Sequence, residues 1–169
     1  ATLRALMALS GAPLPADNGL SLGADIPVCT LARAATMRGI GEDIATVEGL
    51  PPLPAVLVNP RVAVPTPSVF RALRSKTNPA MATIPQGVDF NTFCDWLATP
   101  RNDLEPPARA LAPAIGATLA ALSDARLARM SGSGATCFGL YPTRETAETA
   151  ATRIRAAHPD WWVAATTLS

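Results

Sequence analysis

The sequence predicts an α+β fold in which helices cover one face of a mostly antiparallel sheet. From residue 51 onward the expected elements follow the order strand, helices, hairpin, helix, strand, which is typical of this layered arrangement. Hydrophobic residues make up 49% of the 169 residues and charged residues only 16%, so we expect a packed core. The proline-rich run Gly49-Leu50-Pro51-Pro52-Leu53-Pro54 interrupts the pattern, and we place a domain boundary between residues 50 and 51.

The first 50 residues are expected to form two short helices and a strand. Residues 1–9 have a helical pattern that no capping residue precedes, which indicates that something upstream has been removed. Asp25 followed by Ile26-Pro27 has the arrangement of a second helix start, with proline in the first turn. Residues 36–40 are expected to form a strand.

Beyond the boundary, residues 55–58 predict a buried strand and Thr66-Pro67 predicts a capped helix start. Residues 89–97 predict a short helix, and residues 102–122 a longer one that Pro113 should kink or break. The remaining expected elements are a hairpin, a helix capped by Thr143 and a final strand, at residues 127–140, 143–157 and 161–168.

Charge and cysteine usage argue against several classes of protein. The 14 Lys and Arg residues nearly balance the 13 Asp and Glu residues, so we expect neither a nucleic-acid nor a membrane-surface partner. Three widely spaced cysteines, Cys29, Cys94 and Cys137, disfavour a disulfide framework or a zinc site and favour the cytoplasm. No apolar run reaches the roughly 18 residues of a membrane span. The sequence leaves the oligomeric state open.

Two short segments combine polar groups with small residues. In Leu22-Gly23-Ala24-Asp25-Ile26-Pro27, the Asp25 carboxylate either only caps the helix or acts as a general base beside a substrate hydroxyl. In Ser131-Gly132-Ser133-Gly134-Ala135-Thr136, the small residues suit a tight turn or the close approach of a phosphate. This second segment lacks the Gly-Lys-Ser/Thr ending of a Walker A loop.

Two further segments lie at the starts of expected helices. Thr66 and Phe70, with Val58-Asn59-Pro60 upstream, either grip a polar planar ligand or serve as a helix cap and a core ring. Asn102-Asp103-Leu104-Glu105 is explained by favourable charge at a helix amino terminus. No matching ligand cluster elsewhere in the sequence supports a metal site there.

In their order and approximate spacing, these segments resemble those of the 4-diphosphocytidyl-2-C-methyl-D-erythritol kinases, a family within the GHMP kinase superfamily. The resemblance extends over nearly the whole chain, and its most specific part is the Gly-Ala-Asp-Ile-Pro segment paired with the later Ser-Gly-Ser-Gly-Ala-Thr loop. It implies a GHMP carboxy-terminal domain, a ferredoxin-like layer of antiparallel sheet and helices, at residues 51–169. It also implies that residues 1–50 are a remnant of the amino-terminal ATP-binding domain.

The resemblance further implies an activity. Such kinases transfer the γ-phosphoryl group of ATP to the 2-hydroxyl of 4-diphosphocytidyl-2-C-methyl-D-erythritol, in non-mevalonate isoprenoid biosynthesis. Asp25 falls at the family's catalytic base, and Thr66 and Phe70 fall near the cytidine end of the substrate. The residues Gly132, Ser133 and Gly134 fall in a motif that supports the nucleotide-phosphate loop. Magnesium is expected with ATP, although the sequence assigns no residue as its ligand.

Parts of the family pattern are absent from the sequence. The glycine-rich ATP loop and the segment with the family's catalytic lysine are missing, and Lys76, in an expected loop, is no substitute. We therefore expect the chain alone to be inactive as a kinase. Two alternatives stay open at this point, namely another GHMP small-molecule kinase and an α+β binding module without catalysis.

Overall fold

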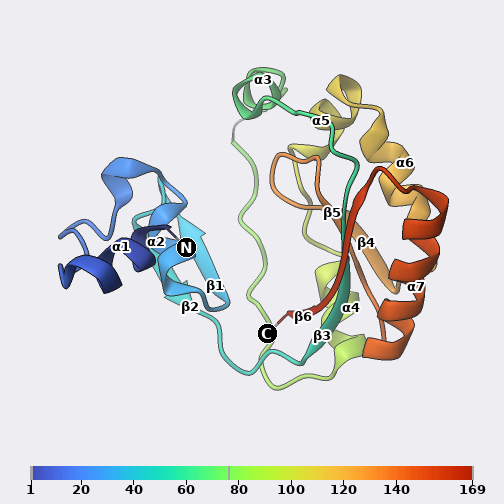
Figure 1. Ribbon diagram of the computed structural model, residues 1–169, viewed down its shortest axis with the longest axis horizontal. Coiled ribbons are helices and arrows are strands. Elements are labelled where there is room, and N and C mark those ends of the chain that lie inside the picture. The colour runs from blue at the N-terminus through green and yellow to red at the C-terminus, as the bar shows by residue number, and fades with distance from the viewer. Residues whose placement is uncertain (1, 76, 169) are drawn as a thin grey trace. The chain divides into compact units, whose positions relative to one another are not determined.

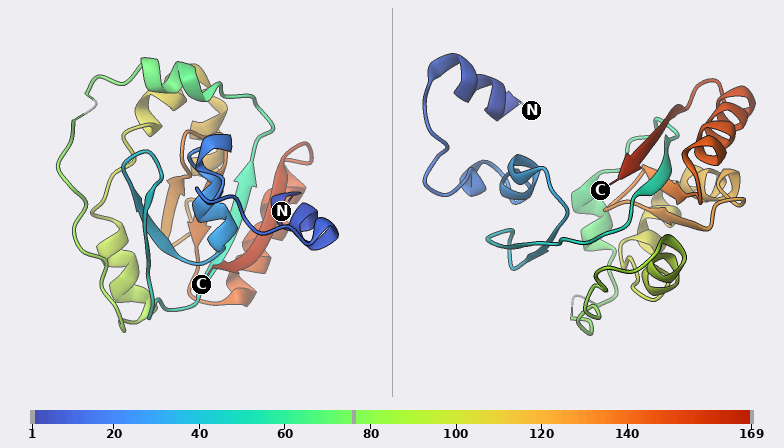
Figure 2. Two further views of the ribbon diagram at one scale, coloured as in Figure 1. Left: turned by 90° about the vertical axis from the view of Figure 1, so that its left-hand side faces the viewer. Right: turned by 90° about the horizontal axis from the view of Figure 1, so that it is seen from below.

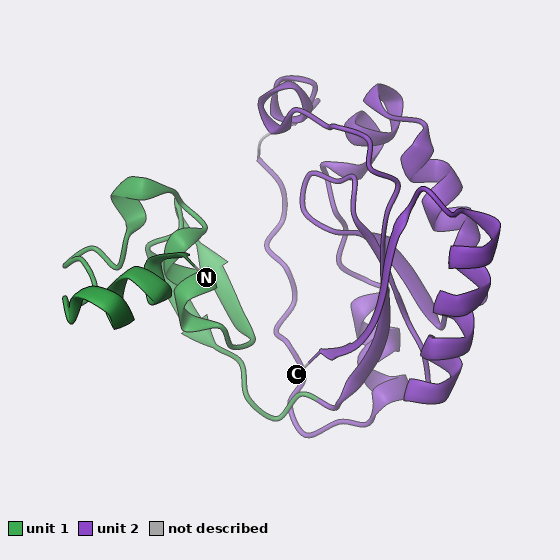
Figure 3. Cartoon of the chain, in the orientation of Figure 1, with its two compact units in different colours: residues 1–50, 169 green, residues 51–168 purple. Residues whose placement is uncertain are grey.

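The computed structural model describes residues 2–75 and 77–168, so Lys76 and its expected loop position lie outside the described residues. The described chain divides into two compact units, one ending at Leu50 and the other running from Pro51 to Leu168 (Figure 3). The division falls within the proline-rich run. The identification of the first unit as a remnant of an ATP-binding domain stays a prediction.

The first unit contains three short helical segments and a two-stranded hairpin. They are α1 (Thr2–Ser10), the 3-10 helix η1 (Leu20–Leu22), α2 (Ile26–Leu31), β1 (Ala35–Arg38) and β2 (Asp43–Thr46). The strands pair antiparallel, with Ala35 opposite Thr46 and Arg38 opposite Asp43. The helices at both predicted positions and the first strand are therefore present, and β2 is an element that the sequence did not indicate.

The second unit contains the other strands and helices. They are β3 (Leu53–Asn59), α3 (Thr66–Arg71), α4 (Phe90–Leu97), α5 (Glu105–Leu111), α6 (Ala114–Ala121), β4 (Leu127–Met130), β5 (Cys137–Leu140), α7 (Arg144–Ala157) and β6 (Trp162–Leu168). The predicted break near Pro113 is real, because α5 ends at Leu111 and α6 begins at Ala114. The predicted cap at Thr143 is confirmed as well, since its side chain accepts a hydrogen bond from the Thr146 amide.

The four strands of the second unit form one sheet in the order β4-β5-β3-β6, in which every neighbouring pair is antiparallel. Helices α6 and α7 lie on the same side of this sheet, as the views in Figures 1 and 2 agree. The predicted α+β class, with helices covering one face of an antiparallel sheet, is confirmed.

The main core lies between this sheet and the two helices. Val56 and Val58 of β3 are fully buried, because alternate residues of a central strand point to the same face. The inward face of α7 is made of small residues and one large one, with the spacing of an amphipathic helix. These residues are Ala147, Ala150, Ala151 and Ile154. The alanines let the helix backbone lie close to the sheet.

Gly139 in β5 is required by the same close packing. It stands opposite Val56, and a Cβ added to it would lie 2.9 Å from the Ala125 Cβ and 3.0 Å from the Leu122 Cδ2. Real Cβ atoms do not come this close to other carbons without displacing them. The turn after α6 therefore packs against bare backbone at this position.

Pro54 lies in a strand, although the sequence placed it in a boundary segment on the argument that proline cannot join a central ladder. It pairs with Thr167 of β6. On the other side, the Tyr141 amide donates to the Pro54 carbonyl at 2.8 Å, and the ladder between β3 and β5 ends one residue earlier, at Ala55 and Leu140. The missing amide proton is thus tolerated because it falls where β5 ends.

Candidate functional site

The glycine loop, residues 131–136, connects β4 to β5 and forms the tip of the predicted hairpin. Its ends are joined by a hydrogen bond from the Ser131 amide to the Thr136 carbonyl at 2.9 Å, and the Gly134 amide donates to the Ser131 carbonyl at 3.0 Å. Gly132 and Gly134 have φ angles of 53° and 87°, which favour glycine. The loop is therefore a specific conformation and not a loose connection.

The two glycines differ in their surroundings. A Cβ on Gly134 would lie 3.0 Å from the Met130 Sδ and 3.1 Å from the Ile115 Cδ1, so this residue is pressed against the core. A Cβ on Gly132 would meet nothing within 4 Å. Gly132 is thus the exposed side of the loop, where a ligand can approach the backbone.

Thr66 does not cap α3, contrary to the capping interpretation of the sequence. The residue before it, Pro65, occupies the cap position, and Thr66 is already helical. Its hydroxyl oxygen instead lies 2.9 Å from the hydroxyl oxygen of Ser133, within hydrogen-bond distance. The structure therefore brings the predicted Thr66 and the predicted glycine loop together.

Phe70 is not a core ring, which was the other structural interpretation of its segment. Half of its surface is exposed, whereas its neighbour Val69 is fully buried. The Phe70 ring lines a groove of about 490 Å³ together with Gly132 of the glycine loop. An exposed aromatic ring beside a polar loop suits a flat ligand with a polar end.

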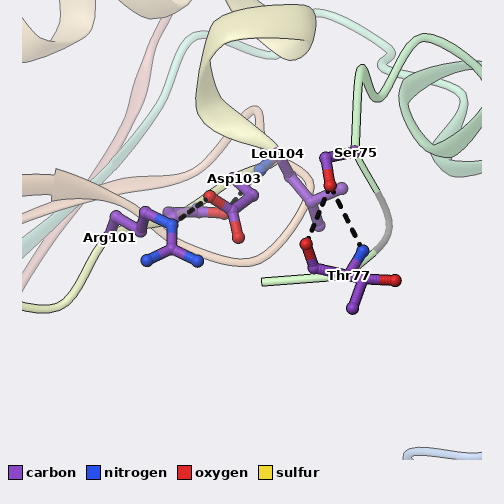
Figure 4. Close-up of polar contacts among 6 residues, drawn as sticks. Ser75, Thr77, Arg101, Asp103 and Leu104 are labelled. Carbon is purple, nitrogen blue, oxygen red and sulfur yellow. Dashed lines mark hydrogen bonds and ion pairs between the residues drawn. The ribbon is translucent and has the colours of Figure 1, made fainter. Parts of the chain in front are cut away.

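The groove is lined by apolar and polar side chains. Leu73 and Leu104 are among the apolar ones, and a second hollow of about 610 Å³ shares Leu73 with the groove and is also lined by Leu111. Among the polar ones, the Arg101 guanidinium pairs with the Asp103 carboxylate at 2.6 Å (Figure 4). This ion pair is exposed, so its contribution to stability is small, but it places both charges at the groove.

Two asparagines contact the glycine loop, and the sequence did not single out either side chain for this. The Asn102 carboxamide donates to the Met130 carbonyl at 3.1 Å and to the Gly132 carbonyl at 2.8 Å. The Asn59 carboxamide donates to the Thr136 hydroxyl at 2.9 Å. The expectation that residues 102–105 form the first turn of a helix is wrong, because α5 begins only at Glu105.

Asp25 belongs to the first unit and is exposed at the start of α2. Its carboxylate makes no capping bond, so the capping interpretation is wrong, although its backbone carbonyl accepts the Cys29 amide at 3.0 Å. A Cβ on Gly41 would collide with the Ala24 carbonyl oxygen. The hairpin turn therefore packs directly on the backbone that carries Asp25.

The described residues contain no metal cluster, membrane-spanning helix or disulfide. Among residues 2–75 and 77–168, no group of three or more His, Cys, Asp or Glu residues could hold a metal ion. Within the same ranges, no helix is long and apolar enough to cross a membrane. The thiols of Cys94 and Cys137 are buried and Cys29 is exposed, and none of the three forms a disulfide.

Comparison with known proteins finds similarity to the GHMP kinases. Residues 88–160 match the family model described as GHMP kinases C terminal. A protein of Dinoroseobacter shibae named 4-diphosphocytidyl-2-C-methyl-D-erythritol kinase is 59% identical over 94% of this chain, which covers 56% of that protein. A protein of the same name from Methylobacterium radiotolerans is 52% identical over 99% of this chain and is covered to 62%. The chain thus spans about 56–62% of the length of these relatives.

Solved structures agree with this assignment. A crystal structure of 4-(cytidine 5'-diphospho)-2C-methyl-D-erythritol kinase matches 99% of this chain and 62% of its own, with a TM-score of 0.74 and 33% identity. The homoserine kinase of Cytophaga hutchinsonii matches 90% of this chain and 54% of its own, with a TM-score of 0.60. At 17% identity, this second match supports the fold alone. The second unit therefore has the fold of a GHMP kinase carboxy-terminal domain, and the chain is similar to proteins named 4-diphosphocytidyl-2-C-methyl-D-erythritol kinase over 94–99% of its length.

Proposed function

We propose that the chain is part of an ATP-dependent kinase that phosphorylates the 2-hydroxyl of 4-diphosphocytidyl-2-C-methyl-D-erythritol. The names of relatives at 50–59% identity support this substrate. The structural observation that supports it is the 2.9 Å contact between Thr66 and Ser133. It joins the segment expected near the cytidine end of the substrate to the glycine loop expected near the phosphates.

Phe70 and Thr66 are proposed to bind the cytidine end. The exposed Phe70 ring offers a face on which a pyrimidine can stack, and such stacking is favourable for any base. Thr66 lies one helical turn away, so its hydroxyl reaches the same ligand while it contacts Ser133. Gly132, Ser133 and Gly134 are proposed to support the phosphate end, because small residues let an anion approach backbone amides.

Asp25 is proposed to be the catalytic base. In phosphoryl transfer, a carboxylate orients the attacking hydroxyl and accepts its proton, as the new oxygen–phosphorus bond forms and ADP leaves. The absence of a capping bond at Asp25 supports this role, because the carboxylate is not committed to the amides of α2. Most of the catalysis would come from positioning and from electrostatic stabilisation of the transferred group.

The described residues do not fit a magnesium cage of their own. Their carboxylates, thiols and imidazole form no group of three that could hold a metal ion. Magnesium in kinases is commonly held by one or two carboxylates together with substrate phosphates. We assign no step of the reaction to a metal bound by this chain.

We also propose that the protein works in the cytoplasm. This is supported by three cysteines that form no disulfide, which is usual in a reducing compartment. It is further supported by the metabolic reaction that the relatives' names describe. Expression in a bacterial host followed by fractionation would test it, and recovery with the periplasmic proteins would contradict it.

Calorimetric titration of the 169-residue chain with 4-diphosphocytidyl-2-C-methyl-D-erythritol tests the substrate. We expect saturable binding to the wild type and no binding of homoserine, the substrate class of the more distant structural match. Binding of homoserine alone would favour another GHMP kinase, and binding of neither would favour a module without this activity. Incubation with ATP, magnesium and substrate, followed by mass spectrometry, should show no turnover by the chain alone.

A further inference from the structure

Two motifs of the sequence have no role in the proposed chemistry, yet each places an asparagine on the glycine loop. Val58-Asn59-Pro60 ends strand β3, and Asn102-Asp103-Leu104-Glu105 leads into α5. Asn59 reaches Thr136 at the end of the loop, and Asn102 reaches Gly132 near its start. The loop is thus held at both ends by side chains from distant parts of the chain.

The Asn102 carboxamide uses both its donor hydrogens and an acceptor position. It donates to the carbonyls of Met130 and Gly132, at 3.1 Å and 2.8 Å, and its own oxygen accepts the Leu104 amide at 3.1 Å. It therefore links three backbone segments, namely the end of β4, the exposed side of the loop and the approach to α5. Asn102 and Gly132 also line the same groove.

The Asn59 carboxamide acts in a similar way at the other end of the loop. Its nitrogen donates to the Thr136 hydroxyl at 2.9 Å, and its oxygen accepts the Arg61 amide at 2.7 Å. Arg61 has a φ of 57°, which costs energy for a residue other than glycine, so the Asn59 bond stabilises an unfavourable turn. The strand end and the loop end are therefore fixed to each other.

We propose that Asn59 and Asn102 are a pair of positioning residues that hold the glycine loop in its groove-lining conformation. In this conformation Ser133 meets Thr66 and Gly132 faces the groove. Neither asparagine is assigned a contact with the reacting atoms, so both act through the loop. The identity of the ligand in the groove rests on the proposed function, whereas the positioning of the loop does not.

The two asparagines differ in what can replace them. The Asn102 side-chain nitrogen donates to two backbone carbonyls, which can only accept. Asn102→Asp therefore loses both of these hydrogen bonds and places a negative charge against two oxygens. At position 59 the partner is a hydroxyl, which can rotate and donate to a carboxylate. Asn59→Asp should therefore keep the contact, and Asn59→Ala should lose it.

Hydrogen exchange and calorimetry on the 169-residue chain test this proposal together. For Asn102→Asp and Asn59→Ala we expect exchange of the Ser131 and Gly134 amides to become about tenfold faster, since each loses a contact that fixes the loop. Affinity for 4-diphosphocytidyl-2-C-methyl-D-erythritol should fall about tenfold as well. Asn59→Asp and the matched control Asn91→Asp, at an exposed site in α4, should behave like the wild type.

The readouts separate positioning from general stability and from the choice of substrate. The Ala151 amide in the buried face of α7 should stay protected from hydrogen exchange in all variants. If Asn102→Asp does not fold, Asn102→Ala takes its place. Unchanged loop exchange in Asn102→Asp and Asn59→Ala would overturn the proposal. If the wild type does not bind the ligand while the loop exchange changes as expected, the substrate assignment fails and the positioning role stands.

Discussion

The hydroxyl oxygens of Thr66 and Ser133 lie 2.9 Å apart, although 67 positions separate the two residues in the sequence. Thr66 begins α3 and Ser133 lies in the glycine loop between β4 and β5. A helix start and a hairpin tip are therefore joined by a polar contact, and a neighbour of each residue, Phe70 in the helix and Gly132 in the loop, lines the groove. This contact brings the two predicted binding segments together.

A double-mutant cycle should detect the contact between Thr66 and Ser133. We expect the losses of unfolding free energy in Thr66→Val and Ser133→Ala, measured in urea, to sum to more than the loss in the double variant. The difference, or coupling, should be about 0.5–1 kcal/mol, typical of one neutral hydrogen bond near the surface. Thr149→Val, at an exposed position of α7, is the matched control and should show no coupling with Ser133→Ala. Strict additivity of the first pair would mean that the two hydroxyls do not interact in solution.

Replacement of Phe70 should separate binding from stability. Because half of the ring is exposed, Phe70→Ala should change the free energy of unfolding by about 0.5 kcal/mol or less. Loss of base stacking should weaken binding of the cytidylated substrate by about 1–3 kcal/mol, measured by calorimetry. Phe93→Ala is the contrasting variant, since its buried ring should cost about 3–5 kcal/mol of stability. Equal affinities of Phe70→Ala and wild type would remove Phe70 from the site.

Asp25 can be tested in an intact kinase that carries this chain. Asp25→Asn should lower kcat by about 10²–10⁴-fold, the usual contribution of a general base. The melting temperature should not change, because the carboxylate makes no capping bond and lies at the surface. Steady-state kinetics and thermal unfolding measure the two effects. Survival of turnover would show that Asp25 is not the base.

Replacement of two glycines by alanine should change the free energy of unfolding in opposite directions. Gly139→Ala should destabilise the protein by about 1–3 kcal/mol, because its Cβ would crowd Leu122 and Ala125. Gly116→Ala should stabilise it by up to about 1 kcal/mol, because Gly116 lies inside α6 and its nearest neighbour would be an Arg109 nitrogen at 3.6 Å. Urea unfolding of both variants measures this. Similar effects at the two positions would contradict the packing described for β5.

Alkaline pH should weaken the fold through Cys137. Burial raises the pKa of this thiol from 9.0 to about 12. Above pH 9 the unfolded chain therefore loses the proton while the folded chain keeps it, so stability should fall by about 1.4 kcal/mol per pH unit from this group until pH 12. Below pH 9 both states are protonated and the group has no effect.

Cys137→Ala provides the matched comparison for this pH dependence. Its unfolding free energy should lack the contribution of the thiol, so the difference between variant and wild type should shift in favour of the variant from pH 9 to pH 11. Burial also raises the pKa of Tyr141, which then adds an equal slope to both proteins. Parallel stability curves in urea would show that the thiol of Cys137 titrates normally in the folded state.

Local signals in the sequence were sufficient to predict most helices and strands of the second unit. Thr143 is hydrogen-bonded to Thr146, three residues away, so its capping role can be predicted from the neighbouring residues alone. Pro113 breaks the helical segment because it lacks an amide proton, wherever the segment lies in the fold. Pro54 shows the limit of the same rule, since its cost depends on where the neighbouring strand ends, which only the sheet determines.

The site depends on partners that local patterns do not contain. Thr66 has the local arrangement of a cap, yet its hydroxyl contacts Ser133, and nothing near residue 66 indicates this. The helix around Phe70 has only six residues, too few for its periodicity to show which side faces the core. Asn59 and Asn102 reach the glycine loop across 77 and 30 positions, so their roles follow only from the folded topology.

The exposed thiol of Cys29 makes the first unit accessible to site-specific chemistry. Cys94 and Cys137 are buried, so a maleimide dye should attach at a single position without any mutation. That position is one helical turn beyond Asp25, whose carbonyl accepts the Cys29 amide. A fluorophore attached there would lie close to the proposed base, so its emission should change when a ligand binds beside Asp25.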